Sequence, residues 1–399
     1  MQLFFAIAYL VAEYMRPQSM YEAVSSVPFA YLSIMGLVIS FLFNKRESLT
    51  SNPLNTLLVM YLIWYLVSYA FAFNQEVAWQ PMLDFTKWVV IYFLLINTIH
   101  EEKKLYIFVL VLLLLYFKLT QFTVRIWVEN GFYSDPRGLN AGGGIGSGFF
   151  QNPNDFGIAL TSVFGLSYYL AWYDERKTSW MKMWWLHAIN SIFFVVSIIA
   201  SSSRGAMIGL AAAIVAIWWK SKRKVLGVSV VAVIGLAVIA AIPADNWERF
   251  QDMGSTEDAT AQSRIALWTS AVRMLNEYPV TGVGPNNFTY VNVQHYHSEF
   301  SEVQHNVFLQ AGSELGYPGL LLLFAMIAAY FVNQKRVRER LVQLNQSRSY
   351  LYGLSHGLDI CMIGFIVNGF FITVLYYPFF WMLLILSASL RRAVEILVK

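Results

Sequence analysis

Apolar runs of membrane length follow one another along almost the whole chain, separated by short polar loops. A bilayer core takes roughly 20 apolar residues per helix, and unpaired backbone groups are costly in lipid, so repeated runs of this length predict a bundle of helices. We therefore expect an all-α polytopic membrane protein. The twelve expected spans are Gln2–Met15, Val27–Phe43, Leu54–Phe73, Phe85–Ile99, Leu105–Phe122, Phe156–Tyr173, Trp184–Ala200, Gly205–Trp219, Val225–Ile242, Val307–Val332, Leu354–Phe371 and Tyr376–Leu390.

One polar stretch of about sixty residues, Pro243 to Gln304, interrupts this pattern between the ninth and tenth runs. It divides the chain into residues 1–242 with nine spans, a loop over residues 243–304, and residues 305–399 with three spans. Apolar residues recur at helical spacing from Ser263 to Met274, which is typical of an amphipathic helix lying on the membrane face. We expect the chemistry of the protein in this loop.

Composition agrees with the membrane class, because 57% of the residues are hydrophobic and only 13% are charged. The single cysteine, Cys361, falls in a predicted span and leaves no internal disulfide to form. The net charge of +4 resides in loops whose basic clusters are not interleaved with aromatic residues, so nucleic-acid binding is not expected.

Basic residues fall mainly in alternate loops, as the positive-inside rule requires of cytoplasmic loops. This distribution places both termini in the cytoplasm and the loops 123–155 and 243–304 outside. The first run lacks a basic n-region and a cleavage site, so we expect a retained first helix. The clusters hold 19 of the 28 basic residues: Lys45 and Arg46; Lys103 and Lys104; Arg176, Lys177 and Lys182; Lys220 to Lys224; Lys335 to Arg348; and Arg391, Arg392 and Lys399.

Arg204 follows Ser203 at the predicted outer junction of the seventh and eighth spans, with no Asp or Glu within twenty residues on either side. An unpaired guanidinium at a membrane boundary is costly. Its partner must therefore come from elsewhere in the fold or from a ligand. A contact with the phosphates of membrane lipids is an equally good interpretation.

Two further arginines, Arg264 and Arg273, lie nine residues apart on the amphipathic segment. Forked guanidinium donors can grip a diphosphate in a way that a lysine cannot. The alternative is that these arginines pair with Asp258 or Glu277 and only solvate the helix.

His305 stands with Asn306 where the outer loop meets the tenth span. With His295 and His297 it raises the possibility of zinc, but the chain offers neither a cysteine pair nor two histidines four apart, so no metal is expected. A histidine has a pKa near 6.5 when unperturbed, which suits a general base. A helix-capping or interface histidine is the alternative.

Ionisable residues within the spans are few, the candidates being Lys118, His187 and Asp359, with His356 as a neighbour of the last. Transporters place such residues along a path through the membrane, and many are built from repeated halves that are not evident here. A transporter of lipid-linked glycans remains the alternative of another class.

The chain resembles the superfamily of O-antigen ligases and polysaccharide polymerases, with motifs from about Asn152 to Gly319 and a similar number of spans. Asn152, Pro153 and Asn154 at the start of the sixth span also resemble a family element. The other motifs, in family order and on one predicted side of the membrane, are Ser203, Arg204 and Gly205; Arg264 to Trp268; Pro279, Gly282, Gly284 and Phe288; and His305, Asn306, Leu309, Glu314, Gly316 and Gly319.

This resemblance implies a metal-independent, inverting glycosyltransferase of the GT-C type, without a cofactor, at the outer face of the bacterial cytoplasmic membrane. It implies a glycan donor on undecaprenyl diphosphate. The family's essential arginines match Arg204 and Arg264, which would bind the diphosphate, and its essential histidine matches His305, which would take the acceptor proton. Substrate contacts are expected at Asn306, Arg273, Asn154 and Ser203.

The acceptor stays open between lipid A-core, a protein and a growing glycan, and so does the choice between ligase and polymerase. Residues Tyr14 to Gln18 resemble the exosortase-associated branch, which is suspected of protein O-glycosylation, whereas the outer loop is short for that role. The glycine-rich segment Gly138–Gly148 lacks the Lys-Ser/Thr of a P-loop, so it is a connector or a lid over the site.

Overall fold

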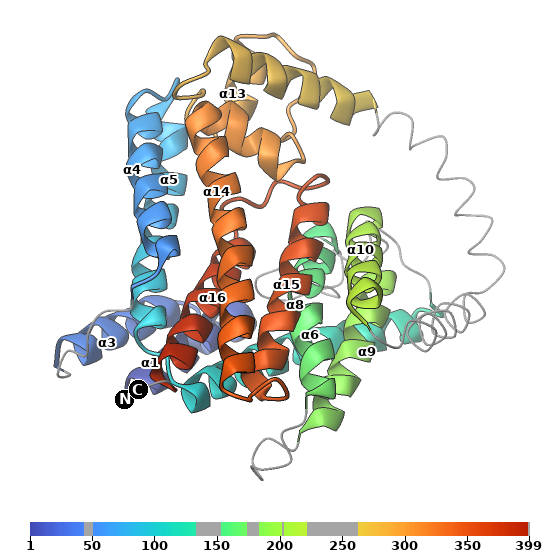
Figure 1. Cartoon of the computed structure of the whole chain (residues 1–399). Coiled ribbons are helices and arrows are strands. Elements are labelled where there is room, and N and C mark those ends of the chain that lie inside the picture. The colour runs from blue at the N-terminus through green and yellow to red at the C-terminus, as the bar shows by residue number, and fades with distance from the viewer. Residues whose placement is uncertain (44–50, 133–152, 174–182, 202, 222–261, 398–399) are drawn as a thin grey trace.

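A computed structural model describes the chain except residues 44–50, 133–152, 174–182, 202, 222–261 and 398–399, and the described residues form helices and loops without a strand (Figure 1). A further helix covers residues 262–277. The labelled helices are α1 (Gln2–Met15), α2 (Pro17–Met20), η1 (Glu22–Val24), α3 (Phe29–Phe43), α4 (Pro53–Ala70), α5 (Gln75–Ile96), α6 (Glu102–Glu129), α8 (Pro153–Trp172), α9 (Trp184–Ala200), α10 (Arg204–Lys220), α13 (Phe288–Gln294), α14 (Val307–Gln343), α15 (Tyr350–Asn368) and α16 (Pro378–Ile396).

Every predicted span within the described residues coincides with a helix, whereas Val225–Ile242 lies outside them. Four of the described helices are long and apolar enough to cross a membrane, namely α4, α6, α14 and α15. The shorter apolar helices include α1, α3 and α9. The chain is therefore an all-helical membrane protein, and the count of twelve spans stays a prediction.

Helix ends differ from the prediction where polar residues extend a helix beyond its apolar run. We expected the fourth span from Phe85, but α5 begins at Gln75. Asn74 caps it by accepting hydrogen bonds from the backbone N–H groups of Glu76 (3.0 Å) and Val77 (3.2 Å). The Asn74 side chain satisfies N–H groups that lack partners within the helix, so the helix can begin well before the apolar run.

The bundle is held together by close backbone approaches as well as apolar packing. Gly165 of α8 and Gly357 of α15 face each other, and a Cβ atom on Gly165 would come within 2.4 Å of the Gly357 carbonyl oxygen. Small residues at such crossings let helices pack in lipid, where the hydrophobic effect does not drive them together. α8 and α15 thus pack closely against each other, and both contact α10.

A small helical cap lies over one end of the bundle, formed by the helix over residues 262–277 and α13 (Figure 1). It has an apolar core of its own, made of Leu267, Ala271, Met274, Val283, Phe288 and Val291. This segment includes the amphipathic helix that we expected from Ser263 to Met274.

The cap is fastened to α14 where that helix breaks. Gly316 has φ 70° and ψ −176°, a conformation reached almost only by glycine. The break lets the turn over residues 279–284 bond to α14 through Val283 N–H to the Ser313 carbonyl (2.9 Å) and Tyr317 N–H to the Pro279 carbonyl (2.8 Å).

An ion-pair cluster lies where α10 ends, beside the middle of α15 and the C-terminal part of α14. The Asp359 carboxylate, 4% exposed, lies 2.6 Å from the Lys220 ammonium and 2.8 Å from the Arg338 guanidinium. His356 instead stacks on Tyr169, with ring centroids 5.4 Å apart. Asp359 thus ties three helices together, and the His356–Asp359 pair considered for a transporter is not among the described ion pairs.

Candidate functional site

Arg204 opens α10 at the capped end of the bundle, and its side chain is exposed. Ser203 accepts a hydrogen bond from the Ala206 N–H (3.3 Å) and so caps the helix. The helix N-terminus adds partial positive charge to that of the guanidinium. This end of α10 is therefore suited to an anion.

Arg264 lies in the first turn of the helix over residues 262–277 and is half-buried. Its Nε atom is buried without a hydrogen-bond acceptor among the described residues. Burial, and secondarily the charge of Arg204, lower the pKa of the Arg264 guanidinium below its ordinary value. The position thus holds a cation close to a second cation, which an anionic ligand would relieve.

His305 lies between the cap and α14, with its backbone at φ 46°. A left-handed conformation is uncommon for a residue with a side chain and is maintained only where neighbours fix it. Burial, followed by the charge of Arg264, lowers the pKa of the His305 imidazole, while Glu302 raises it. The lowered pKa favours the neutral ring, which is the form that can accept a proton.

Arg204, Arg264 and His305 form one electrostatic cluster, although 101 residues separate the first from the last. The charge of Arg204 acts on Arg264, and the charge of Arg264 acts on His305. They come from α10, the cap and the loop before α14. Two cations beside a neutral base can hold a polyanion while a proton is removed nearby.

Asn306 caps α14 by accepting hydrogen bonds from the Phe308 N–H (2.9 Å) and the Leu309 N–H (3.0 Å). Its side-chain oxygen, like that of Ser203, is therefore engaged by the start of a helix. Both were expected as substrate contacts, and the structure gives them the task of fixing the helix starts next to Arg204 and His305. This task is common for Ser and Asn at such positions.

Arg273 does not belong to the cluster. Its guanidinium is exposed, pairs with Glu277 at 2.7 Å and lies 4.0 Å from the centre of the Tyr296 ring. The sequence left this pairing open as the alternative, and helix geometry explains it. Nine residues at about 100° each turn Arg273 roughly 180° away from Arg264.

Asn154 lies in the first turn of α8, but its side chain is outside the described residues, as are Asp258 and the segment Gly138–Gly148. The start of α8 lies against the start of α10, since a Cβ atom on Gly157 would come within 2.6 Å of the Ala206 Cβ and 3.1 Å of the Ser201 Oγ. The backbone at Asn154 is thus close to the helix start that carries Arg204.

Sequence reasoning gave Glu314 no chemical part, although it is 2% exposed and lies two turns into α14. Its carboxylate accepts hydrogen bonds from the Asn286 N–H (2.8 Å), the Gln304 amide (3.3 Å) and the Tyr376 hydroxyl. A glutamate within an apolar run is itself the signal that could have identified it.

No three His, Cys, Asp or Glu side chains come together as metal ligands within the described residues. His295 packs edge-on against Phe73, with ring centroids 5.0 Å apart, and His297 is exposed. The three histidines that suggested zinc thus have different surroundings.

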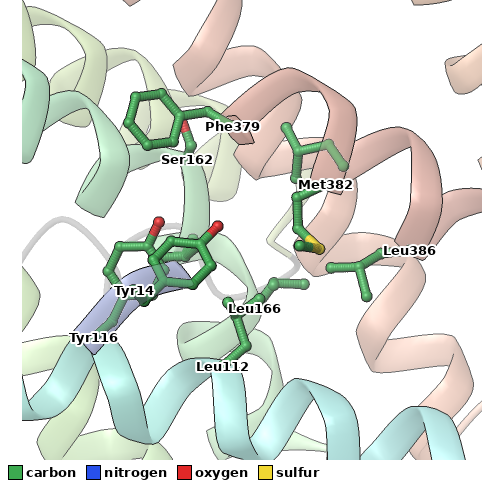
Figure 2. A pocket seen from close by; sticks show the side chains of 10 residues that line it. Tyr14, Leu112, Tyr116, Ser162, Leu166, Phe379, Met382 and Leu386 are labelled. Carbon is green, nitrogen blue, oxygen red and sulfur yellow. The ribbon is translucent and has the colours of Figure 1, made fainter. Parts of the chain in front are cut away.

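A pocket within the bundle, lined by Tyr14, Ser162, Phe379 and other mostly apolar residues, is separate from this cluster (Figure 2). Tyr14 and Tyr116 lie side by side on its wall, with ring centroids 5.3 Å apart. None of Arg204, Arg264 and His305 lines it. We interpret it as a gap in helix packing.

Two stretches of the chain match known families. Residues 189–324 match a family described as O-antigen ligase, and residues 2–167 match a family of unknown function. The first stretch contains Arg204, Arg264 and His305 and agrees with the resemblance carried by the motifs. The chain matches no curated protein.

Proposed function

We propose that this membrane protein transfers a glycan from undecaprenyl diphosphate to an acceptor hydroxyl. The premise is the match of residues 189–324 to the O-antigen ligase family. Such enzymes act on lipid-linked glycans and their acceptors. The specific donor, the inverting course and a ligase reaction are our proposals. A polymerase that joins lipid-linked repeat units is the second candidate, since it would need the same donor site.

The observation that carries the proposal is the Arg264 guanidinium, half-buried beside Arg204 with its Nε lacking an acceptor among the described residues. A buried guanidinium N–H without an acceptor is costly unless a ligand supplies one. A diphosphate carries the charge and the paired oxygens that guanidinium groups bind in a bidentate way.

In the proposed reaction, the neutral His305 ring takes the proton of the acceptor hydroxyl. The hydroxyl oxygen forms a bond to the anomeric carbon as the bond from that carbon to the diphosphate oxygen breaks. The electron pair leaves with the diphosphate, where Arg204 and Arg264 stabilise the growing charge. Attack from the face opposite the leaving group inverts the anomeric centre, and no metal or cofactor takes part.

The site lies where α10 and α14 begin, whereas Lys220 ends α10 and Arg338 lies in the last turns of α14. Both chain termini lie at the end of the bundle away from the cap (Figure 1). Basic residues favour the cytoplasmic side, so we assign the active site to the outer face of the bacterial cytoplasmic membrane and both termini to the cytoplasm. A GT-C-like architecture with twelve spans goes with this assignment.

A transporter receives less support from the same features. Asp359 is engaged by two cations, and His187 contributes its backbone carbonyl to Ser167 and Ser191. The Asp359 carboxylate and the His187 carbonyl thus link neighbouring residues of the bundle. The three candidate catalytic residues gather instead at one end of the bundle, as transfer requires.

Transfer by the purified protein tests the proposal. Lipid-linked glycan extracted from the source cells is incubated with candidate acceptors and a chelator, and the products are resolved by size. We expect transfer by the wild type and by Arg273→Ala, and none by His305→Ala, Arg204→Ala or Arg264→Ala at equal membrane abundance. A single glycan block on an acceptor other than the donor indicates a ligase, whereas a series of product sizes built on the donor indicates a polymerase. Transfer by His305→Ala at the wild-type level would refute the mechanism.

A further inference from the structure

We propose that Glu314 is a positioning residue that sets His305 and Arg264 relative to each other, acting through Gln304. This inference rests on the proposed function. Glu314, Asn286, Gln304 and Tyr376 are called the Glu314 junction below. The geometry around His305 carries the inference.

The backbone on both sides of His305 is fixed by hydrogen bonds. After it, Asn306 caps α14, and the Val307 N–H donates to the Gly369 carbonyl (2.7 Å). Before it, Gln304 is fully buried and its amide nitrogen donates to the Glu314 carboxylate. These hydrogen bonds hold both neighbours of His305, and so they hold its backbone at φ 46°, from which the imidazole projects.

Gln304 also holds the helix that carries Arg264. The Trp268 indole N–H donates to the Gln304 carbonyl oxygen at 2.8 Å. Trp268 follows Arg264 by four residues, so the two side chains leave the helix on the same face. Gln304 therefore links the segment that carries His305 to the helix that carries Arg264.

Glu314 is what holds Gln304. Its carboxylate collects donors from the turn over 284–287, from the loop before α14 and from the loop over 369–377. Its backbone carbonyl accepts from the Ser68 hydroxyl of α4 (2.9 Å). No cation pairs with this carboxylate within the described residues. These hydrogen bonds therefore offset the cost of removing the Glu314 carboxylate from water.

The Glu314 junction thus gathers separate segments of the chain around the residue that precedes His305. Catalysis by positioned groups is sensitive to small displacements, and a shift of about 1 Å can cost about 10²-fold in rate. Weakening the junction should therefore lower kcat while the arginines still bind the diphosphate.

The experiment compares Glu314→Gln, Glu314→Leu and Trp268→Phe with Asn333→Ala in the purified full chain. Asn333 is the control because it is also buried in α14 and donates to Ser387 (2.8 Å), but at the far end of the helix. Measured quantities are kcat per folded protein with extracted lipid-linked glycan, affinity for undecaprenyl diphosphate, and thermal stability.

We expect Glu314→Gln to lower kcat about tenfold and Glu314→Leu about 10²-fold, because glutamine keeps one acceptor oxygen and leucine keeps none. Affinity for undecaprenyl diphosphate should stay within about twofold in Glu314→Gln, and Asn333→Ala should keep kcat within about twofold. The double variant Trp268→Phe/Glu314→Gln should lose less than the product of the single losses, since both act through Gln304.

Full kcat per folded protein in Glu314→Gln and Trp268→Phe, with only lower thermal stability, would overturn the positioning role. A multiplicative double variant would also overturn it. If Glu314→Leu does not accumulate in the membrane, Trp268→Phe and Glu314→Gln decide the matter. His305→Ala in the same assay separates the two proposals, because full activity there contradicts the proposed function itself.

Discussion

Replacing Gly316 by alanine tests how the break in α14 holds the cap over the bundle. Gly316 has φ 70° and ψ −176°, and a Cβ atom there would meet the Val280 carbonyl oxygen at 2.1 Å and the Pro279 carbonyl oxygen at 2.8 Å. The alanine side chain therefore fails in two ways, through the backbone conformation and through the space available.

The two costs can be estimated separately. A side chain in this region of φ and ψ costs about 1–3 kcal/mol. Overpacking of the new methyl group against the backbone of the neighbouring turn costs typically about 1–3 kcal/mol more. The turn over 279–284 must move away, which weakens the hydrogen bonds from Tyr317 to Pro279 and from Val283 to Ser313. We expect a total of roughly 2–6 kcal/mol, by adding the two terms.

Gly312→Ala is the matched control on the same helix. Its φ lies outside the left-handed range, and the nearest atom to a new Cβ is the Leu275 Cδ2 at 3.1 Å, the end of a flexible side chain. Alanine is favoured over glycine within a helix by about 1 kcal/mol, which offsets the slight crowding.

The assay is thermal unfolding in detergent, followed by tryptophan fluorescence, together with glycan transfer at a temperature where each variant is folded. Gly316→Ala should unfold at a clearly lower temperature than Gly312→Ala and should lose transfer, because the cap carries Arg264. Equal melting temperatures and equal transfer in the two variants would refute this account of the break.

Two further predictions concern the charges of the site. Glu302 raises the pKa of His305, so Glu302→Gln should lower this pKa further and move the acid limb of the kcat/KM profile to lower pH. An acid limb that stays in place or moves to higher pH would contradict the assignment of His305 as the base. High salt should reduce the difference between the two profiles, because Glu302 is exposed. Arg264→Lys keeps the charge but loses the forked donors, so we expect a loss in kcat of about 10²-fold. Arg273→Ala breaks an exposed ion pair with Glu277 and the contact with the Tyr296 ring, and should change kcat by no more than about twofold. Equal losses in the two variants would contradict a role for Arg264 in binding the diphosphate.

The prediction for Arg273 shows where sequence reasoning reached its limit. The sequence left Arg273 open between a substrate contact and a pair with Glu277, and the observed partners Glu277 and Tyr296 decided for the pair. Ser203 and Asn306 show the same limit, since their types suit both substrate contact and helix capping. The structure uses their side chains as caps.

The sequence by itself determined the membrane class, the positions of the helices within the described residues and the amphipathic helix of the cap. These follow from local patterns, because a membrane-length apolar run has no stable alternative to a helix in lipid. It also singled out Arg204, Arg264 and His305 as separate motifs, each with an ordinary interpretation beside the functional one.

Only the tertiary structure decided that the three residues share one electrostatic environment. It also decided that the Glu314 carboxylate accepts a hydrogen bond from Gln304, the residue before His305. The shared surroundings of the three residues depend on how α10, the cap and α14 pack, and no local pattern encodes an interaction between segments so far apart in the sequence. The lowered pKa of His305 is likewise a property of burial and of the Arg264 charge. The electrostatics of the candidate site therefore arise from packing, whereas the candidate residues themselves could be identified from the sequence.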